Sequence, residues 1–277
     1  MGKGPGLYYE IGKKTRDLLT RDFSCTRKFT ITTTTENGIV FTTTGVKGCN
    51  GMMCDVNTMF KNKYLSANMK VDTNANIFTT IRGDDCALGS TTILSFTLPD
   101  FSSGKLEFQH SQEYAGITLA LGMTPSPIVE ITGVLGTEGL VIGGELAIDH
   151  TRGISLNKYN AGIGFARPDF NASIILAEKG NVLKASYLHT LSPASKTTLA
   201  AEITHMFSRN ENTFTMGGLY ELDKMTSMKG RLNNHGQMGV TLQHEFRPKN
   251  SVTFSGEVDT KALDHSAKFG IAIALNS

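Results

Sequence analysis

The chain has 277 residues, of which 39% are hydrophobic, 19% are charged and none is tryptophan. Its 27 basic and 25 acidic residues give a formal charge of +2, which excludes the strongly basic face typical of nucleic-acid-binding proteins. The composition also excludes a collagen, a disulfide-stapled scaffold and a wholly disordered chain. Four cysteines lack the spacing of a zinc site, and we expect free thiols at Cys25, Cys49, Cys54 and Cys86.

The first 23 residues have a helical period, and residues 1–28 carry seven basic and three acidic side chains. The apolar stripe consists of Leu7, Ile11, Leu18 and Leu19. The opposite side carries Lys13, Lys14 and Arg16. This spacing predicts one short amphipathic helix, weakened by Gly12. No run of about 18 apolar residues that could form a spanning helix follows it, and no signal peptide is expected.

From residue 28 onward, the apolar side chains recur with a period of two, which is typical of strands that have one apolar face. The segment 140–149 is an example, because Leu140, Ile142 and Leu146 alternate with small or polar residues. Turn signals about every dozen residues separate about nineteen strands, the first at 28–35 and the last at 267–276. The pattern shows no second helix and no domain break.

Strands with one apolar face can pack against each other in a soluble sandwich, or they can close into a barrel that faces lipid. The strands are many, and each has the length of about ten residues that a tilted strand needs to cross a bilayer. A barrel of this size is too wide for side chains to fill. The sequence therefore predicts an all-β, 19-stranded transmembrane β-barrel over residues 27–277, preceded by a helix and linker over 1–26. The missing tryptophan argues against it, and a soluble β-rich binding protein is the alternative.

Both ends of the chain carry longer motifs. They are Gly4-Pro5-Gly6-Leu7-Tyr8, Arg16-Asp17-Leu18-Leu19, Gln243-His244-Glu245-Phe246-Arg247-Pro248-Lys249 and Ser255-Gly256-Glu257-Val258-Asp259. With them the chain resembles the plant voltage-dependent anion channels, the mitochondrial porins. The family is known to have nineteen strands, so our strand count is not independent of it. The import channel of the same membrane shares this fold and is a second alternative.

The resemblance implies a voltage-gated, anion-selective channel of the mitochondrial outer membrane for small ions and metabolites, including adenine nucleotides. It places the N-terminal helix inside the lumen. The implied partners are the lipid bilayer, the solutes in transit and the outer-membrane assembly machinery, and homo-oligomers are left open. We expect no nucleic acid, no cofactor, no metal and no catalytic residue.

Candidate site residues fall into four groups. The pore-helix charges are Lys13, Lys14 and Arg16, and the pore-helix docking residues are Leu7, Ile11 and Leu18. The lumen cations, which share the polar parity of their strands, are Lys28, Lys61, Lys70, Lys105, Lys184 and Arg231. The sorting signal that the family implies consists of Lys268, Gly270, Ile273 and Leu275. The alternatives are a helix on the membrane surface and ordinary solvated strand faces.

Three departures from the family pattern are visible. Gly89-Ser90-Thr91 stands in place of a Gly-Leu-Lys tripeptide proposed to bind nucleotide. The linker 22–26 has no glycine that could act as a hinge. Met69 stands where some members carry a lipid-facing glutamate.

Overall fold

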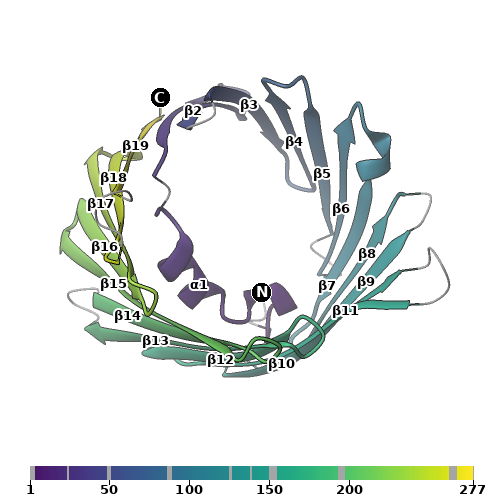
Figure 1. Cartoon of the computed structure of the whole chain (residues 1–277). Helices are drawn as coiled ribbons and strands as arrows, with labels where there is room; N and C mark the ends of the chain where they lie inside the picture. The colour runs from purple at the N-terminus through teal and green to yellow at the C-terminus, as the bar shows by residue number, and fades with distance from the viewer. Residues whose placement is uncertain are drawn as a thin grey trace.

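The computed structural model of the chain describes residues 4–23, 25–48, 51–85, 89–124, 127–137, 139–149, 155–192, 197–261 and 267–276. Strands form a continuous wall around a lumen, and the N-terminal segment lies inside that lumen (Figure 1). The all-β, 19-stranded barrel predicted from the sequence is confirmed, with nineteen strands counted over the described residues.

The N-terminal segment contains the short 3-10 helix η1 (Tyr8–Glu10) and the helix α1 (Lys13–Thr20). A second 3-10 turn, η2 (Phe101–Ser103), lies between two strands. The strands are β1 (Arg27–Thr34), β2 (Ile39–Gly48), β3 (Gly51–Lys61), β4 (Leu65–Asp72), β5 (Ile77–Asp85), β6 (Ser90–Leu98), β7 (Lys105–Ser111), β8 (Ala115–Gly122), β9 (Ile128–Gly136), β10 (Leu140–Asp149), β11 (Ser155–Ala166), β12 (Phe170–Ala177), β13 (Val182–Ser192), β14 (Thr197–Met206), β15 (Glu211–Asp223), β16 (Thr226–Asn233), β17 (Gln237–Arg247), β18 (Asn250–Asp259) and β19 (Lys268–Asn276).

The barrel closes where its first and last strands meet. β1 and β19 pair in parallel, with Phe29 opposite Ile273, whereas each other neighbouring pair is antiparallel. An odd number of alternating strands makes this one parallel pair unavoidable. Closure matters because a strand edge left open in hydrocarbon would expose backbone N–H and C=O groups that have no partner.

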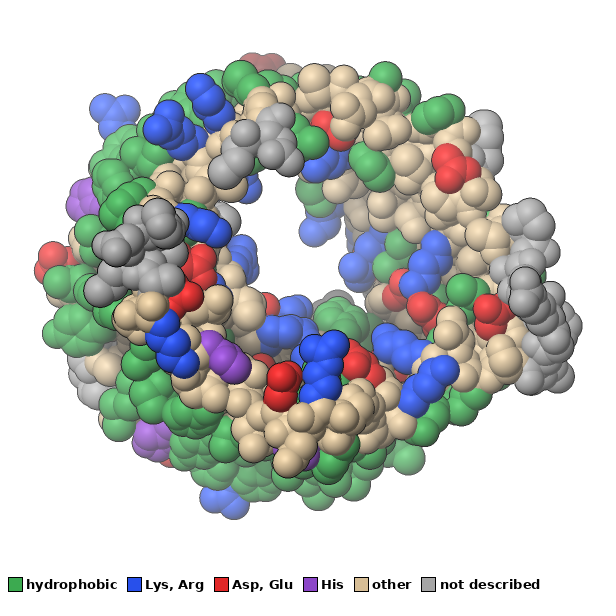
Figure 2. Space-filling model, viewed as in Figure 1, with side chains coloured by type: hydrophobic (Ala, Val, Ile, Leu, Met, Phe, Trp, Pro, Cys, Tyr) green, Lys and Arg blue, Asp and Glu red, His purple; other side chains and the backbone are tan. Residues whose placement is uncertain are grey.

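The register places side chains of opposite character on the two faces. Ile131, Leu146 and Tyr159 lie side by side on the outer face of β9, β10 and β11. They are 38%, 44% and 40% exposed, values far above those of a packed core. In the adjacent row, Glu130 and Lys158 face the lumen. Figure 2 shows the same division, with hydrophobic side chains on the outside and charged side chains around the opening.

This arrangement shows that the soluble-protein alternative is wrong, because a soluble barrel would bury its apolar faces rather than turn them outward. None of the helices in the described part of the chain is long and apolar enough to cross a membrane.

Substitutions at two neighbouring residues of β9 test which face of the barrel wall lies in lipid. We expect Ile131→Lys to lower the free energy of unfolding from lipid vesicles by about 2–4 kcal/mol, because it places an ammonium in hydrocarbon. Thr132→Lys changes the next residue, which faces the lumen, and should cost less than about 1 kcal/mol in the same urea titration. Equal losses from the two variants would contradict the orientation.

Candidate functional site

The N-terminal segment is bent rather than continuously helical. The short amphipathic helix predicted for this segment is present as α1, and η1 is separated from it at Gly12, which has φ of +68°. A Cβ at Gly12 would lie 2.6 Å from Oγ of Ser173 on β12. The bend is therefore tied to a close approach between the segment and the barrel wall, which a side chain at this position would prevent.

The apolar stripe of the segment faces that wall. Leu7, Ile11 and Leu18, the predicted docking residues, are all buried. Leu18 packs with Leu19 against residues of β13 and β14. Burial of each such side chain contributes about 1.5–3 kcal/mol relative to exposure. The bend at Gly12 lets both halves of the stripe reach the wall. The wall residues in this cluster are Leu188, Ala200 and Leu219.

Glycines on the inner face of the barrel make room for the segment. A Cβ on Gly217 would lie 2.7 Å from Cδ2 of Leu19, and one on Gly239 would lie 2.9 Å from Cδ1 of Phe23. A Cβ on Gly116 would collide with the backbone of the segment. Several small residues on the inner face of the barrel therefore seat the segment.

Lys229 on β16 holds the end of the segment. Its Nζ lies 2.6 Å from Oδ2 of Asp22. Thr241 on β17 donates a hydrogen bond of 3.2 Å to the carbonyl oxygen of Asp22. The backbone of Asp22 has φ of +74°, in the left-handed region that non-glycine residues rarely adopt. Asp22, the second residue after the helix, is thus fixed through both its side chain and its backbone.

Arg231, two residues further along β16, makes three contacts. Its Nη1 donates to the carbonyl oxygen of Leu19 (3.0 Å), and its Nη2 donates to Oε1 of Glu257 (3.1 Å). Its guanidinium lies 4.5 Å from the ring centre of the buried Phe23. A cation at this place also suits the negative end of the helix dipole. We call these residues the anchor cluster: Asp22, Phe23, Lys229, Arg231 and Glu257.

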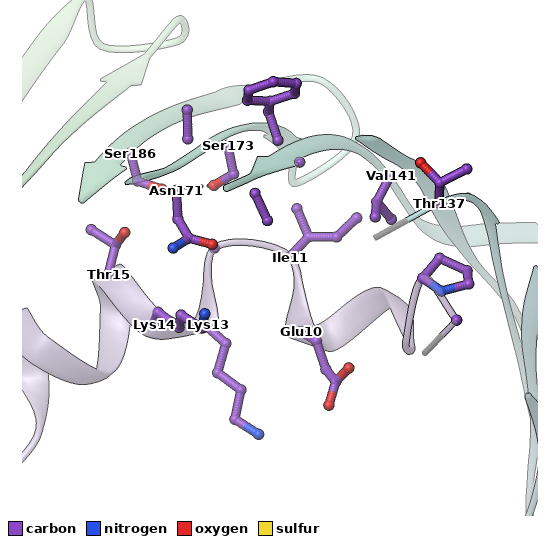
Figure 3. Close-up of a pocket in the computed structure, with 17 residues that line it drawn as sticks. Glu10, Ile11, Lys13, Lys14, Thr15, Thr137, Val141, Asn171, Ser173 and Ser186 are labelled. Carbon is purple, nitrogen blue, oxygen red and sulfur yellow. Dashed lines mark hydrogen bonds between the residues drawn. The ribbon is translucent and has the colours of Figure 1, made fainter. Parts of the chain in front are cut away.

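The predicted pore-helix charges lie on the lumen side of the segment. Lys14 and Arg16 are exposed, and Nη2 of Arg16 donates a hydrogen bond of 3.2 Å to the carbonyl oxygen of Tyr9. Nζ of Lys13 lies 5.1 Å from the ring centre of Tyr9. Figure 3 shows Lys13 pointing away from the strands, whereas Ile11 and Thr15 point toward them. A pocket of about 180 Å³ lies between this part of the segment and the wall.

Tyr8 is a half-buried polar residue of the segment. Its hydroxyl is buried and has no hydrogen-bond partner among the described residues. The pKa of Tyr8 is raised to about 12. The larger cause is burial, which disfavours the charged phenolate, and the smaller cause is the negative charge of the nearby Glu145. The hydroxyl therefore stays neutral at physiological pH and adds no charge to the lumen.

The predicted lumen cations divide into paired and unpaired groups, although strand register turns all of them inward. Lys70 pairs with Asp55 (2.9 Å), and Lys105 pairs with Glu130 (2.7 Å). Arg231 belongs to the anchor cluster. Three cations form no ion pair with a described residue, and they are Lys28, Lys61 and Lys184. The pairing differs among these residues because the carboxylates sit on particular neighbouring strands, which the parity of one strand does not indicate.

A cavity of about 400 Å³ lies between the segment and the wall from β7 to β13. Arg16 contributes from the segment and Lys184 from β13. Among the carboxylates of this wall, Glu130 pairs with Lys105, and Glu145 accepts from Lys158 (2.8 Å) and from Asn160 (2.7 Å). Glu107 accepts a hydrogen bond from Gln109 and forms no ion pair with a described residue. The cavity thus offers two cations that form no ion pair with the described residues to a passing anion.

The remaining predicted residues lie on β19 and β4. On β19, Lys268 and Gly270 face inward, and Ile273 and Leu275 face outward. Met69 on β4 faces outward, as its parity predicts.

Gly89 precedes β6, with φ of +63°. Cys25 and Cys54 are free thiols among the described residues, whereas Cys49 and Cys86 lie outside them. Within the described ranges, no group of three or more His, Cys, Asp or Glu side chains is arranged to hold a metal ion.

A wide barrel with an apolar exterior, a charged lumen and an internal N-terminal segment is the geometry of a pore. The family model for eukaryotic porins matches residues 4–270. The chain belongs to the eukaryotic porin family. This porin is a pore-forming channel of the mitochondrial outer membrane, in agreement with the names of its relatives.

Three relatives illustrate the similarity. The mitochondrial outer membrane porin of 34 kDa from Solanum tuberosum is 50% identical over 99% of both chains. Mitochondrial outer membrane porin 3 from Arabidopsis thaliana is 46% identical over 99% of both chains. An outer plastidial membrane porin from Pisum sativum is also 46% identical, again over 99% of both chains.

The anchor cluster can be tested by hydrogen exchange. We expect Arg231→Met to speed the exchange of the amides in α1 about tenfold, because the helix loses a charge-assisted hydrogen bond worth about 1.5–3 kcal/mol. Lys61→Met removes a lumen cation from β3, outside the anchor cluster, and should leave the exchange unchanged. The measurement is mass-detected exchange in lipid nanodiscs. Unchanged exchange in Arg231→Met would show that the anchor cluster does not hold the helix.

Proposed function

We propose that this porin is a voltage-gated channel that prefers anions and passes small metabolites, including adenine nucleotides. The observation that carries the proposal is the water-accessible lumen, in which a charged helical segment narrows the passage. The helix bears Lys13, Lys14 and Arg16 on the side that faces the lumen. These side chains are the proposed pore-helix charges.

The anion preference rests on the unpaired cations. An ion pair has little field at a distance, so Lys70 and Lys105 contribute less than their charge suggests. Lys28, Lys61 and Lys184, together with Arg16, attract anions without a paired carboxylate among the residues that the structure describes. Salt screens such charges within about 10 Å at 0.1 M, so the preference is modest in a wide pore.

The proposed gating depends on two kinds of contact between the segment and the barrel, which are apolar docking along one face and polar contacts at the C-terminal end of the helix. Leu7, Ile11 and Leu18 dock it against the wall, whereas its charged face remains in water and responds to the membrane potential. The anchor cluster fixes the C-terminal end of the helix. Any movement of the segment therefore begins at its N-terminal half rather than at the linker, which lacks a glycine hinge.

Planar-bilayer recording tests the proposal. We expect large conductance steps near zero voltage that fall as the voltage rises at either polarity. Under a KCl gradient, Lys28→Gln/Lys61→Gln/Lys184→Gln should shift the reversal potential toward cation permeation, and the shift should shrink in about 1 M salt because the Debye length falls to roughly 3 Å.

The matched control is Lys105→Gln/Glu130→Gln, which removes an ion pair without changing the net charge of the lumen. It should leave the reversal potential in place. A triple variant with unchanged selectivity, or a wild-type conductance that does not depend on voltage, would contradict the proposal.

We also propose that β19 carries the sorting signal for the outer-membrane assembly machinery. Its polar Lys268 and its Gly270 face the lumen, whereas Ile273 and Leu275 face outward. β19 must pair with β1 to close the barrel, so the strand that machinery recognises is also the strand that completes insertion. The porin names of the relatives favour a pore for small solutes over the import channel.

A further inference from the structure

The start of helix α1 carries backbone donors that the protein leaves without a partner. Its N-cap is Gly12, which has no side chain and forms no capping hydrogen bond, and its first turn holds no acidic residue. The N–H groups of Lys13, Lys14 and Thr15 come too early in the helix to reach a carbonyl four residues back. They donate to no described residue, whereas the N–H of Arg16 donates to the carbonyl oxygen of Gly12. The start of α1 therefore presents free donors at the positive end of the helix dipole.

These donors border the pocket of about 180 Å³ that lies between the segment and the wall (Figure 3). We call it the rear pocket, because it lies on the wall side of the segment. The wall contributes residues of β10 to β13, and its polar side chains at this pocket include Asn171, Ser173 and Ser186. The volume falls below the range of about 300–1,000 Å³ that is typical of sites for drug-sized molecules. The rear pocket therefore suits a small ion better than a nucleotide.

Thr15 adds a buried hydroxyl to the rear pocket. The residue is only 2% exposed, yet its side chain forms no hydrogen bond with a described residue. Figure 3 shows Thr15 pointing from the helix toward the wall. A hydroxyl that is removed from water without a partner is costly, so nearly all such groups in proteins are hydrogen-bonded. The burial of Thr15 is explained if a bound acceptor occupies the rear pocket.

The wall offers a further donor from a pair of serines. Oγ of Ser173 and Oγ of Ser186 lie 2.6 Å apart, and the two residues are 5% and 9% exposed. One hydroxyl donates to the other, which leaves the hydrogen of the second for another acceptor. Neither side chain forms a second hydrogen bond with a described residue. Figure 3 shows the amide of Asn171 pointing from the same wall toward the segment. Polar groups on both sides of the rear pocket thus have hydrogens to donate.

The charges around the rear pocket favour an anion. Lys13 and Lys14 line it, and Glu10 is the one acidic residue among the described residues that do so. Figure 3 shows the carboxylate of Glu10 pointing away from the wall, and its Oε2 accepts from the N–H of Leu7 (3.4 Å). A cation would meet donors and a net positive charge here. A tetrahedral oxyanion has oxygens in several directions, so it can accept from the helix and from the wall at the same time.

We propose that the rear pocket binds a free phosphate ion. Its oxygens accept from the N–H groups at the start of α1, from the hydroxyl of Thr15 and from the serine pair. The bound ion links α1 to β12 and β13, which carry Ser173 and Ser186. The site lies behind the segment, and it does not depend on the gating or selectivity proposed for the lumen.

The experiment uses the full-length, isotope-labelled porin in lipid nanodiscs and follows its amide resonances by NMR. Inorganic phosphate is exchanged for chloride at constant pH and ionic strength. We expect shifts at Lys13, Lys14 and Thr15 that saturate with phosphate. Thr15→Val keeps the shape of the side chain and removes its hydroxyl, so it should raise the half-saturating concentration about tenfold. Thr15→Ser keeps the hydroxyl and should bind like the wild type. Adenosine monophosphate should not compete, because it is too large for the rear pocket.

The matched control is Thr20→Val, the same substitution on the same helix. Thr20 is exposed, and its hydroxyl donates to the carbonyl oxygen of Arg16 (2.6 Å) rather than facing the rear pocket. This variant should bind like the wild type. Hydrogen exchange of α1 without phosphate shows whether each variant still docks. If Thr15→Val does not dock, Ser173→Ala tests the same pocket from the wall and should weaken binding severalfold.

Three results would overturn the proposal. They are shifts that rise linearly with phosphate, equal binding by the Thr15→Val and Thr20→Val variants, and competition by adenosine monophosphate at Thr15. The first would mean that the rear pocket holds only water, and the last would mean that the phosphate group of a nucleotide is the ligand.

Discussion

The structure depends on one requirement, which is that every backbone polar group of a strand in hydrocarbon must have a partner. The parallel pairing of β1 with β19 meets it by removing the last open edge. Closure forces alternate side chains to opposite faces of one wall, so apolar residues meet lipid and polar residues meet water. The width of the lumen then follows from the number of strands, because a wall of this circumference cannot be filled from within.

A wide lumen needs an additional element if its permeability is to change, and the N-terminal segment is that element. Its apolar stripe and the inner glycines give it a place on one side of the wall, whereas the side formed by β2 to β6 stays open (Figure 1). The anchor cluster adds directional contacts at the C-terminal end of the helix. The segment is thus fixed most firmly where it joins the barrel, and its charged residues lie closest to the path of the solutes.

The fold could be predicted because the two faces of the wall meet such different solvents that side-chain type alone indicates orientation. Ile131 and Leu146 are apolar for this reason, and exceptions such as the lumen-facing Phe78 are few enough to leave the pattern readable. The site was less predictable, because its contacts join distant parts of the chain. Arg231 and Leu19 are 212 positions apart, and strand parity marks Arg231 only as a lumen cation. The need for glycine at position 12 also comes from a distant residue, because a Cβ there would lie 2.6 Å from Oγ of Ser173.

The central claim is that the apolar face of the wall lies in lipid and the polar face in water, and a spin-label scan of β4 tests it most directly. This strand faces the open side of the lumen, so the N-terminal segment does not shield it. Labels placed singly at positions 65 to 72 should alternate, with oxygen reaching Leu65, Ala67, Met69 and Val71 better and a water-soluble nickel chelate reaching Ser66, Asn68, Lys70 and Asp72 better. A scan without this period of two, or with its phase reversed, would contradict the account.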